Sequence, residues 1–225
     1  MSNSADLKQL WRRLVGFGFR LLYHEMAFTY DVVSWTVSMG EWQCWQRAAL
    51  KHLNVEAGAR VLELAHGPGN LQIDLRSAGL NPVGLDFSAQ MGEIAYGKLT
   101  RHDIAPKLVR GRAQALPFAA ASFGVIVSTF PTDFIIDPLT IAEAYRVLKP
   151  GGRLVFVPNG VLTRGGVARQ GIEAAYRATG QSGSWPIQVR DRFTAAGFTI
   201  SQVMEQCQSS VAQVVIAEKP AKSEG

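Results

Sequence analysis

The sequence is poor in residues and patterns that mark several classes of protein. Its 225 residues include two cysteines, Cys44 and Cys207, which lie far apart, cannot form a disulfide framework and have no metal-ligand spacing. A reducing cytoplasm is therefore the default compartment. No run of about 18 uncharged apolar residues is present, which argues against a membrane span. Arg12, Arg13 and Arg20 interrupt the apolar N-terminal stretch, so it does not form a convincing signal peptide.

Other chemistry-bearing patterns are also missing. There is no internal repeat, no Asp/Glu/His metal constellation and no cysteine nucleophile with a plausible partner. The net charge of +5 comes without a Lys/Arg block interleaved with aromatic residues, so no nucleic-acid partner is expected. A hydrophobic content of 47% predicts a globular chain, and the length suits one domain with a sizeable core.

Three segments can be distinguished along the chain. Residues 1–57 are helical in pattern and rich in aromatic residues, residues 58–218 form the core, and residues 219–225 form a flexible polar tail. The core alternates helices with β-branched strands that end at Gly, Pro or polar residues. The expected strands are 60–64, 82–85, 107–109, 123–128, 153–157, 199–206 and 210–218, and the expected helices are 69–77, 88–100, 137–148 and 187–196.

This alternation predicts an α/β, Rossmann-like, doubly wound sheet of seven strands with an N-terminal helical lid. The sheet is expected to be mostly parallel. A short polar turn around residues 208–210 joins the last two strands, and such a turn permits only an antiparallel pair. The last strand is therefore expected to be antiparallel and to form one reversed edge.

The most informative stretch runs from the first strand into the first helix. Gly67 and Gly69 stand in the connecting turn, where glycine allows close approach to a ligand and positive φ. Glu63 lies in the preceding strand, and the second strand ends in Asp86 about 20 residues further on, as in nucleotide sites of doubly wound sheets. Gln72 occupies the place of the third glycine of the dinucleotide fingerprint. A dinucleotide cofactor such as NAD therefore fits this turn less well than another nucleoside-bearing cofactor.

Asp86 is expected to accept hydrogen bonds from both hydroxyls of a ribose. Its alternative role, capping the next helix, is less favoured because Ser88 is available as the cap. Phe87 and Met91 could pack on an adenine face or, equally well for Met91, belong to the core.

The order of four motifs resembles the class I S-adenosylmethionine-dependent methyltransferases. They are Glu63-Leu-Ala-His-Gly-Pro-Gly69, Gly84-Leu-Asp-Phe-Ser-Ala-Gln-Met91, Ala113-Gln-Ala-Leu-Pro-Phe118 and Arg146-Val-Leu-Lys-Pro-Gly-Gly-Arg-Leu154. The Leu-Pro-Phe segment is similar to the branch that includes ubiquinone and menaquinone biosynthesis methyltransferases. A further match over residues 30–47 implies that Tyr30 borders the cofactor. The resemblance implies S-adenosyl-L-methionine as cofactor.

The residues expected to contact this cofactor combine the glycine turn, the ribose acid, the adenine side and the fourth strand. They are Tyr30, Glu63, Ala65, His66, Gly67, Gly69, Asp86, Phe87, Met91, Arg112, Ala113, Gln114 and Ser128.

Three positions depart from the family pattern: Ala65, Arg112 and Gly124, which stands where the family usually has an Asp after Phe123 in the fourth strand. Ala65 replaces the first-motif glycine, and its methyl group is tolerated if the backbone there has negative φ, although the pocket loses room. Arg112 stands where the family commonly has an acid, and it could stack on the base or swing into solvent.

The N-terminal segment offers a lid and a membrane contact. Residues 6–24 project as a basic amphipathic helix, which can pack on the core as a lid or lie at a membrane surface as a peripheral contact. Substrate contacts are expected from Tyr23, His24, Phe130 and Phe134, which favours a small hydrophobic or aromatic acceptor. The candidates for a catalytic base are His24, Tyr30 and His66.

The sequence thus predicts a methyltransferase acting on a small molecule, with a quinone- or lipid-like acceptor among the options. Two alternatives stay open: a catalytically silent cofactor-binding regulatory or assembly protein, which Ala65 and Arg112 favour, and an RNA methyltransferase, which only the net charge favours. The acceptor atom and the oligomeric state cannot be predicted from these residues.

Overall fold

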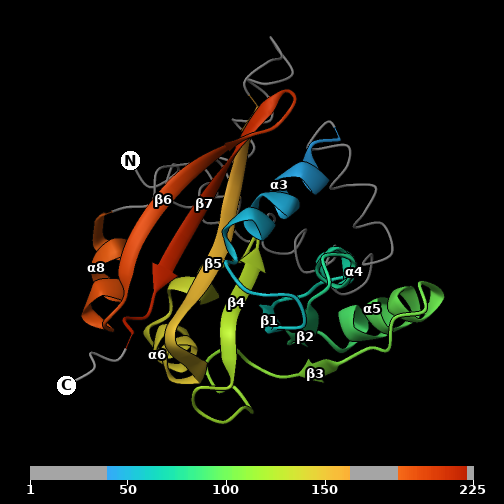
Figure 1. The fold of residues 1–225 in the computed structure, drawn as a ribbon, viewed down its shortest axis with the longest axis horizontal. Coiled ribbons are helices and arrows are strands. Elements are labelled where there is room, and N and C mark those ends of the chain that lie inside the picture. The colour runs from blue at the N-terminus through green and yellow to red at the C-terminus, as the bar shows by residue number, and fades with distance from the viewer. Residues whose placement is uncertain (1–39, 163–186, 222–225) are drawn as a thin grey trace, which may run out of the picture.

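A computed structural model describes residues 40–162 and 187–221. These residues form a seven-stranded sheet in the order β3-β2-β1-β4-β5-β7-β6 (Figure 1). The strands in chain order are β1 (Arg60–Leu64), β2 (Asn81–Asp86), β3 (Leu108–Arg110), β4 (Phe123–Thr129), β5 (Leu148–Leu162), β6 (Thr199–Gln206) and β7 (Ser210–Glu218). The α/β class and the seven strands predicted from the sequence are confirmed.

Helices connect the strands as the alternating pattern predicts. They are α3 (Trp42–Ala48), η3 (Ala49–His52), α4 (Asn70–Ser77), α5 (Ala89–Arg101), η4 (Asp133–Ile136), α6 (Pro138–Val147) and α8 (Ile187–Ala195). Asp137 and Ser88 start α6 and α5 by accepting backbone N–H groups with their side chains. Local capping chemistry therefore fixes where these helices begin.

The five strands β1 to β5 are parallel to one another, and β7 is antiparallel to both β5 and β6. The last strand is antiparallel, as predicted. Its expected place at an edge is wrong, because β7 lies between β5 and β6 and leaves β6 at the edge. The short turn fixes the direction of β7 relative to β6, but tertiary pairing with β5 decides which of the two becomes internal.

Strand β5 is longer than the predicted 153–157. It begins at Leu148, where a register irregularity accommodates residues 149–152, and it continues to Leu162 by pairing with β7. A second irregularity lies between Phe156 and Asn159 and contains Pro158, which has no N–H to donate to the ladder. The sequence does not predict this extension, because Pro158 and Gly160 are residue types that usually interrupt a strand.

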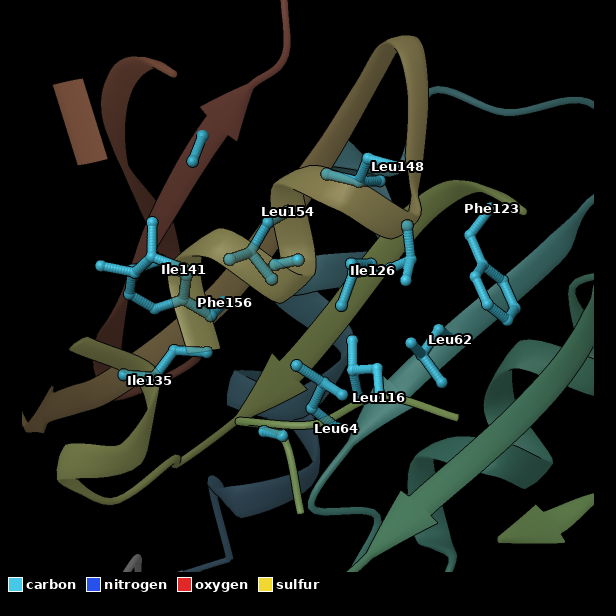
Figure 2. Packing of buried hydrophobic residues seen from close by; sticks show 14 of the residues in the cluster. Leu62, Leu64, Leu116, Phe123, Ile126, Ile135, Ile141, Leu148, Leu154 and Phe156 are labelled. Atoms are coloured by element: carbon cyan, nitrogen blue, oxygen red, sulfur yellow. The ribbon is translucent and has the colours of Figure 1, made fainter. Parts of the chain in front are cut away.

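The sheet is covered on both faces by apolar clusters. On one face, α6 and α8 pack against a cluster that includes Leu62, Ile126 and Phe156 (Figure 2). On the other, α3, η3 and α4 cover Val61 and Val127. Residues 42–52, which the sequence analysis grouped with the lid, thus contribute to the packed core. This double cover leaves the carboxyl ends of β1, β2 and β4 as the place for a site.

Helix α3 is fastened to the turn between β6 and β7. A disulfide joins Cys44 to Cys207 across 163 residues of sequence, with a Cα–Cα distance of 6.1 Å. The expectation that the two cysteines form no disulfide is therefore wrong, because folding brings residues that are distant in the sequence together. The Glu41 carboxylate lies within 4.8 Å of both sulfurs, a spacing that could suit a metal ion. The two sulfurs are bonded to each other, however, so they form a disulfide here.

Polar contacts add to the disulfide at this junction. The indole N–H of Trp45 donates to the Ser210 hydroxyl at 2.7 Å, and that hydroxyl donates to Glu41 at 2.6 Å. The Trp45 ring lies where a Cβ at Gly160 would be, only 2.2 Å away, so glycine is required there. These contacts hold α3 across β5 and β7.

Candidate cofactor site

The turn after β1 is fixed by a backbone hydrogen bond and by two glycines with positive φ. The N–H of Ala65 donates to Leu85 O at 2.8 Å, which ties the end of β1 to β2. Gly67 and Gly69 both have positive φ, at 52° and 85°, and Gly69 precedes the first residue of α4. The two glycines thus supply the left-handed conformations that this reversal needs.

Ala65 shares this conformation without being a glycine. Its φ is 56°, so the negative φ that would make its methyl group harmless is not what the structure shows. An L-residue in this region costs on the order of 1–2 kcal/mol. The turn is therefore strained at the position where the family has glycine. The Ala65 methyl group was expected to be tolerated if φ were negative, and the structure does not meet this condition.

Asp86 connects the ends of β1 and β2. Its Oδ2 accepts the N–H of Gly67 at 2.9 Å and its Oδ1 accepts the N–H of Ser88 at 2.8 Å. The helix cap itself is Ser88, whose hydroxyl accepts from Met91 N at 3.3 Å. As predicted, Asp86 is not needed as the cap of α5, and each of its oxygens retains a lone pair for a further donor.

A cavity of about 420 Å³ opens at this edge of the sheet. It lies at the carboxyl ends of β1, β2 and β4, where the strand order reverses between β1 and β4. Its walls are Ala65, Gly67, Leu85, Asp86, Phe87, Ser88, Met91, Gly111, Arg112, Ala113, Gln114, Thr129, Phe130, Pro131, Thr132 and Phe134. The volume is within the range typical of small-molecule sites.

One side of this cavity is a mixed apolar and cationic wall. The Phe87 side chain is 53% exposed, and the Arg112 guanidinium lies 4.7 Å from its ring centroid. Arg112 thus lies over a protein ring while it remains exposed to solvent. Met91 and Ala113 are buried beside it. The Gln114 amide donates to Asp137 at 3.1 Å, which connects this wall to α6.

Of the predicted cofactor residues that the structure describes, four do not line the cavity: Glu63, His66, Gly69 and Ser128. The Ser128 hydroxyl donates to Leu64 O at 2.8 Å between strands and is fully buried. Gly69 lies against Ala95, where a Cβ would approach to 3.0 Å. These two residues serve packing and pairing in the structure.

Glu63 and His66 lie behind the turn. Glu63 is 2% exposed and accepts a hydrogen bond from the Gln72 amide at 2.5 Å. Burial raises the pKa of the Glu63 carboxyl to about 8, which leaves it largely protonated at neutral pH. His66 is 4% exposed, with Nδ1 2.7 Å from Gly67 O, and burial lowers the pKa of its imidazole.

Gly84 makes room for this buried group. A Cβ there would lie 2.9 Å from His66 Cδ2 and 3.2 Å from Gln72 Nε2. The glycine of the second motif thus accommodates the residues that support the turn from behind. His66 is held away from the cavity, which disfavours it as the base in a reaction there.

Phe130 and Phe134, which the sequence analysis assigned to the substrate side, both line the cavity. Phe130 has a φ of 51° and stacks on Trp42 with ring centroids 3.8 Å apart. Thr129, Pro131 and Thr132 also line the cavity, and Pro131 and Thr132 belong to the segment 130–134 that was expected on the substrate side. Thr129 was missed, although its position at the end of the fourth strand was the available signal, because sites form at the carboxyl ends of parallel strands.

Three predicted site residues, Tyr23, His24 and Tyr30, and the amphipathic segment 6–24 lie outside the described residues. Within the described ranges, none of the helices has the length and apolar character needed to cross a bilayer.

Sequence comparisons find methyltransferase relatives that match part of the chain. Demethylmenaquinone methyltransferase of Beutenbergia cavernae is 38% identical over 135 residues, which are 60% of this chain and 55% of that protein. Its Lactiplantibacillus plantarum counterpart is 34% identical over 140 residues, or 60% of this chain and 59% of that protein. The alignments thus span little more than half the length of these curated relatives.

Solved structures share the fold at lower identity. The YcgJ protein of Bacillus subtilis superposes with a TM-score of 0.62 at 17% identity, covering 79% of this chain and 99% of that one. The ubiE/COQ5 methyltransferase family profile matches residues 19–177, which is well over half of the sequence. The chain therefore belongs to the ubiE/COQ5 methyltransferase family.

Proposed function

We propose that this protein transfers a methyl group from S-adenosylmethionine to a small, hydrophobic, quinone-like acceptor. The observation that carries the proposal is the Asp86 carboxylate, which lines a cavity of about 420 Å³ beside the Gly67 N–H at the switch point of the sheet. Family membership supports the same chemistry. The relatives named demethylmenaquinone methyltransferase favour a quinone-like acceptor.

The residues present fit an adenosyl group. Asp86 offers lone pairs to the ribose hydroxyls, and its bond to Gly67 fixes the carboxylate in place. Met91, Ala113 and the Phe87 ring offer apolar surface to the adenine. When bound, S-adenosylmethionine supplies an already activated methyl group on its sulfonium. The protein's part is then to align the acceptor and to exclude water.

The acceptor side is assigned to the segment after β4. Phe130, Pro131 and Phe134 give this end of the cavity apolar surface suited to an aromatic ring. Among the described cavity residues, Asp86 and Arg112 are the ionisable ones. We assign Asp86 to the ribose, so a base for a protonated acceptor would come from His24 or Tyr30, or the acceptor would react already ionised.

An apolar acceptor would be met at a membrane surface. The basic amphipathic pattern of residues 6–24 supports peripheral contact with a bilayer from the cytoplasmic side. This contact would bring the substrate side of the cavity close to a lipid-soluble quinone.

A second function is favoured by one observation. The positive φ of Ala65 places a methyl group and backbone strain in the turn that would hold the cofactor. This arrangement supports a protein that binds the cofactor or its product without turnover. An RNA methyltransferase has only the net charge in its favour.

The test has two stages with purified protein. Calorimetric titration with S-adenosylmethionine and S-adenosylhomocysteine measures binding, and absence of affinity for both contradicts the methyltransferase and the silent binder together. Transfer of a labelled methyl group to a lipid extract, with the product identified by mass spectrometry, then tests catalysis. Loss of transfer after RNase treatment would favour RNA, whereas loss after removal of lipids supports the quinone-like acceptor.

A further inference from the structure

Gln46 on α3 carries a buried polar atom that the fold does not use. The residue is only 8% exposed. Its Nε2 donates to the Thr129 hydroxyl at 3.4 Å, while Oε1 has no hydrogen-bond partner among residues 40–162 and 187–221. Buried acceptors without partners are rare because they lose hydration without compensation. This orphaned oxygen therefore points to a ligand with a hydrogen to donate.

The position of Gln46 relates it to the cofactor cavity. Its partner Thr129 is the last residue of β4 and lines that cavity together with Ala65 and Gly67. Asp86 is assigned to the ribose, and Arg112 and Met91 belong to the adenine side. The end formed by Ala65 and Thr129 is then left for the rest of the cofactor, its amino-acid chain. Gln46 contacts the wall of the cavity at this end through its hydrogen bond to Thr129.

The side chain is held on a fixed support. Trp42 on the same helix stacks on Phe130, another cavity residue, at 3.8 Å between centroids. The next turn is fixed by Trp45 on Ser210 and by the Cys44–Cys207 disulfide. A separate hollow of about 440 Å³ between α3, α4 and α5 is lined by Gln46. This rigidity is what a binding group requires.

We propose that the Gln46 Oε1 atom accepts a hydrogen bond from the ammonium group of the amino-acid end of the cofactor. An ammonium group offers only donors, and a neutral carbonyl oxygen can accept one of them without bringing a second charge into the buried site. The Thr129 hydroxyl, which accepts from Nε2, holds the amide with its oxygen left without a partner among the described residues. This inference rests on the proposed cofactor.

The experiment compares two ligands that differ at the relevant end. S-adenosylhomocysteine has the amino-acid chain, whereas 5′-methylthioadenosine has the same adenosyl thioether without it. Both are titrated calorimetrically into the wild type and Gln46→Met, which has a similar volume and no acceptor. We expect Gln46→Met to weaken S-adenosylhomocysteine about tenfold or more and to leave 5′-methylthioadenosine within about twofold.

Two further variants complete the design. Gln43→Met changes an exposed glutamine on the same helix and should leave both affinities unchanged. Gln46→Glu supplies a stronger acceptor and should keep or improve the affinity for S-adenosylhomocysteine. Thermal unfolding of each variant confirms that it is folded, and Gln46→Glu carries the test if Gln46→Met does not fold.

Several outcomes would overturn the inference. Unchanged binding of both ligands in Gln46→Met would show that the oxygen has no ligand role. An equal loss for both would make Gln46 a support of the cavity wall. A loss of S-adenosylhomocysteine in Gln46→Glu alone would show that the amide donates to a carboxylate. If the wild type binds neither ligand, the proposed function itself fails, which is a separate result.

Discussion

The carboxylate of Asp86 accepts the backbone N–H of Gly67 at 2.9 Å, so the acid at the end of β2 holds the glycine turn that follows β1. The other carboxylate oxygen accepts the Ser88 N–H and fixes the start of α5. One side chain thus sets the relative positions of the turn and the next helix. The proposed ribose site is pre-organised, because these two hydrogen bonds hold the Asp86 carboxylate in place before any cofactor is bound.

Replacing this acid should weaken cofactor binding. We expect Asp86→Ala to reduce the affinity for S-adenosylhomocysteine by about 1–3 kcal/mol, because a charge-assisted hydrogen bond to the ribose is lost. The variant should also unfold at lower temperature, since the Gly67 N–H loses its acceptor. Calorimetric titration and thermal unfolding measure the two effects.

Controls separate the two roles of Asp86. Asp86→Asn keeps one acceptor oxygen and should recover part of the thermal stability while still binding weakly. Asp191→Ala changes an exposed acid on α8 and should alter neither quantity. An unchanged dissociation constant in Asp86→Ala would remove the ribose role.

Ala65 provides a test of backbone strain. Its φ of 56° predicts that Ala65→Gly raises the free energy of unfolding by about 0.5–1 kcal/mol, because relief of the left-handed strain exceeds the added freedom of the unfolded chain. The melting temperature should rise by about 1–3 °C. Ala142→Gly, on the exposed face of α6, is the matched control and should destabilise by about 1 kcal/mol. A lower melting temperature for Ala65→Gly would contradict the strain.

Local patterns predict most of this fold. The strands 60–64, 199–206 and 210–218 have the predicted bounds, because β-branched residues and turn residues delimit them within a few positions. The length of β5 and the internal place of β7 depend on pairing between distant strands, which leaves no local mark. The Cys44–Cys207 bond is hidden from the sequence for the same reason.

The site is predictable where spacing encodes it. Gly67 and Asp86 were expected from the strand-turn-helix pattern, and the structure joins them. The sequence also predicts Glu63 and His66 as ligands, but polar residues near a turn can point to either side of a sheet, and these two support it from behind. Gln46 shows no sequence signal, because a buried unpaired oxygen is a property of tertiary packing.

The buried Glu63 should make stability depend on pH. Its pKa is raised to about 8 in the folded protein, above the value of 4.5 for an exposed glutamate, so the folded state binds more protons between these values. The free energy of unfolding should therefore fall as pH rises from about 5 to 8, by up to about 1.4 kcal/mol per unit from this group. Denaturant unfolding at several pH values measures this dependence.

Glu63→Gln supplies the comparison for this effect. The amide oxygen can still accept from Gln72 and does not ionise, so the variant should lose the decline and gain stability over the wild type toward pH 8. Parallel pH profiles for the two proteins would show that Glu63 is already ionised in the fold.

The disulfide between α3 and the β6–β7 turn should contribute directly to stability. We expect the double variant Cys44→Ser, Cys207→Ser to lose about 2–4 kcal/mol of unfolding free energy, because the cross-link restricts a long loop in the unfolded chain. Dithiothreitol should lower the melting temperature of the wild type toward that of the double variant and leave the variant unchanged. The contacts of Trp45 and Glu41 with Ser210 do not require the bond, so the reduced protein should remain folded. A wild-type melting temperature that is insensitive to reductant, with free thiols verified by a thiol reagent, would show that the polar contacts alone secure α3.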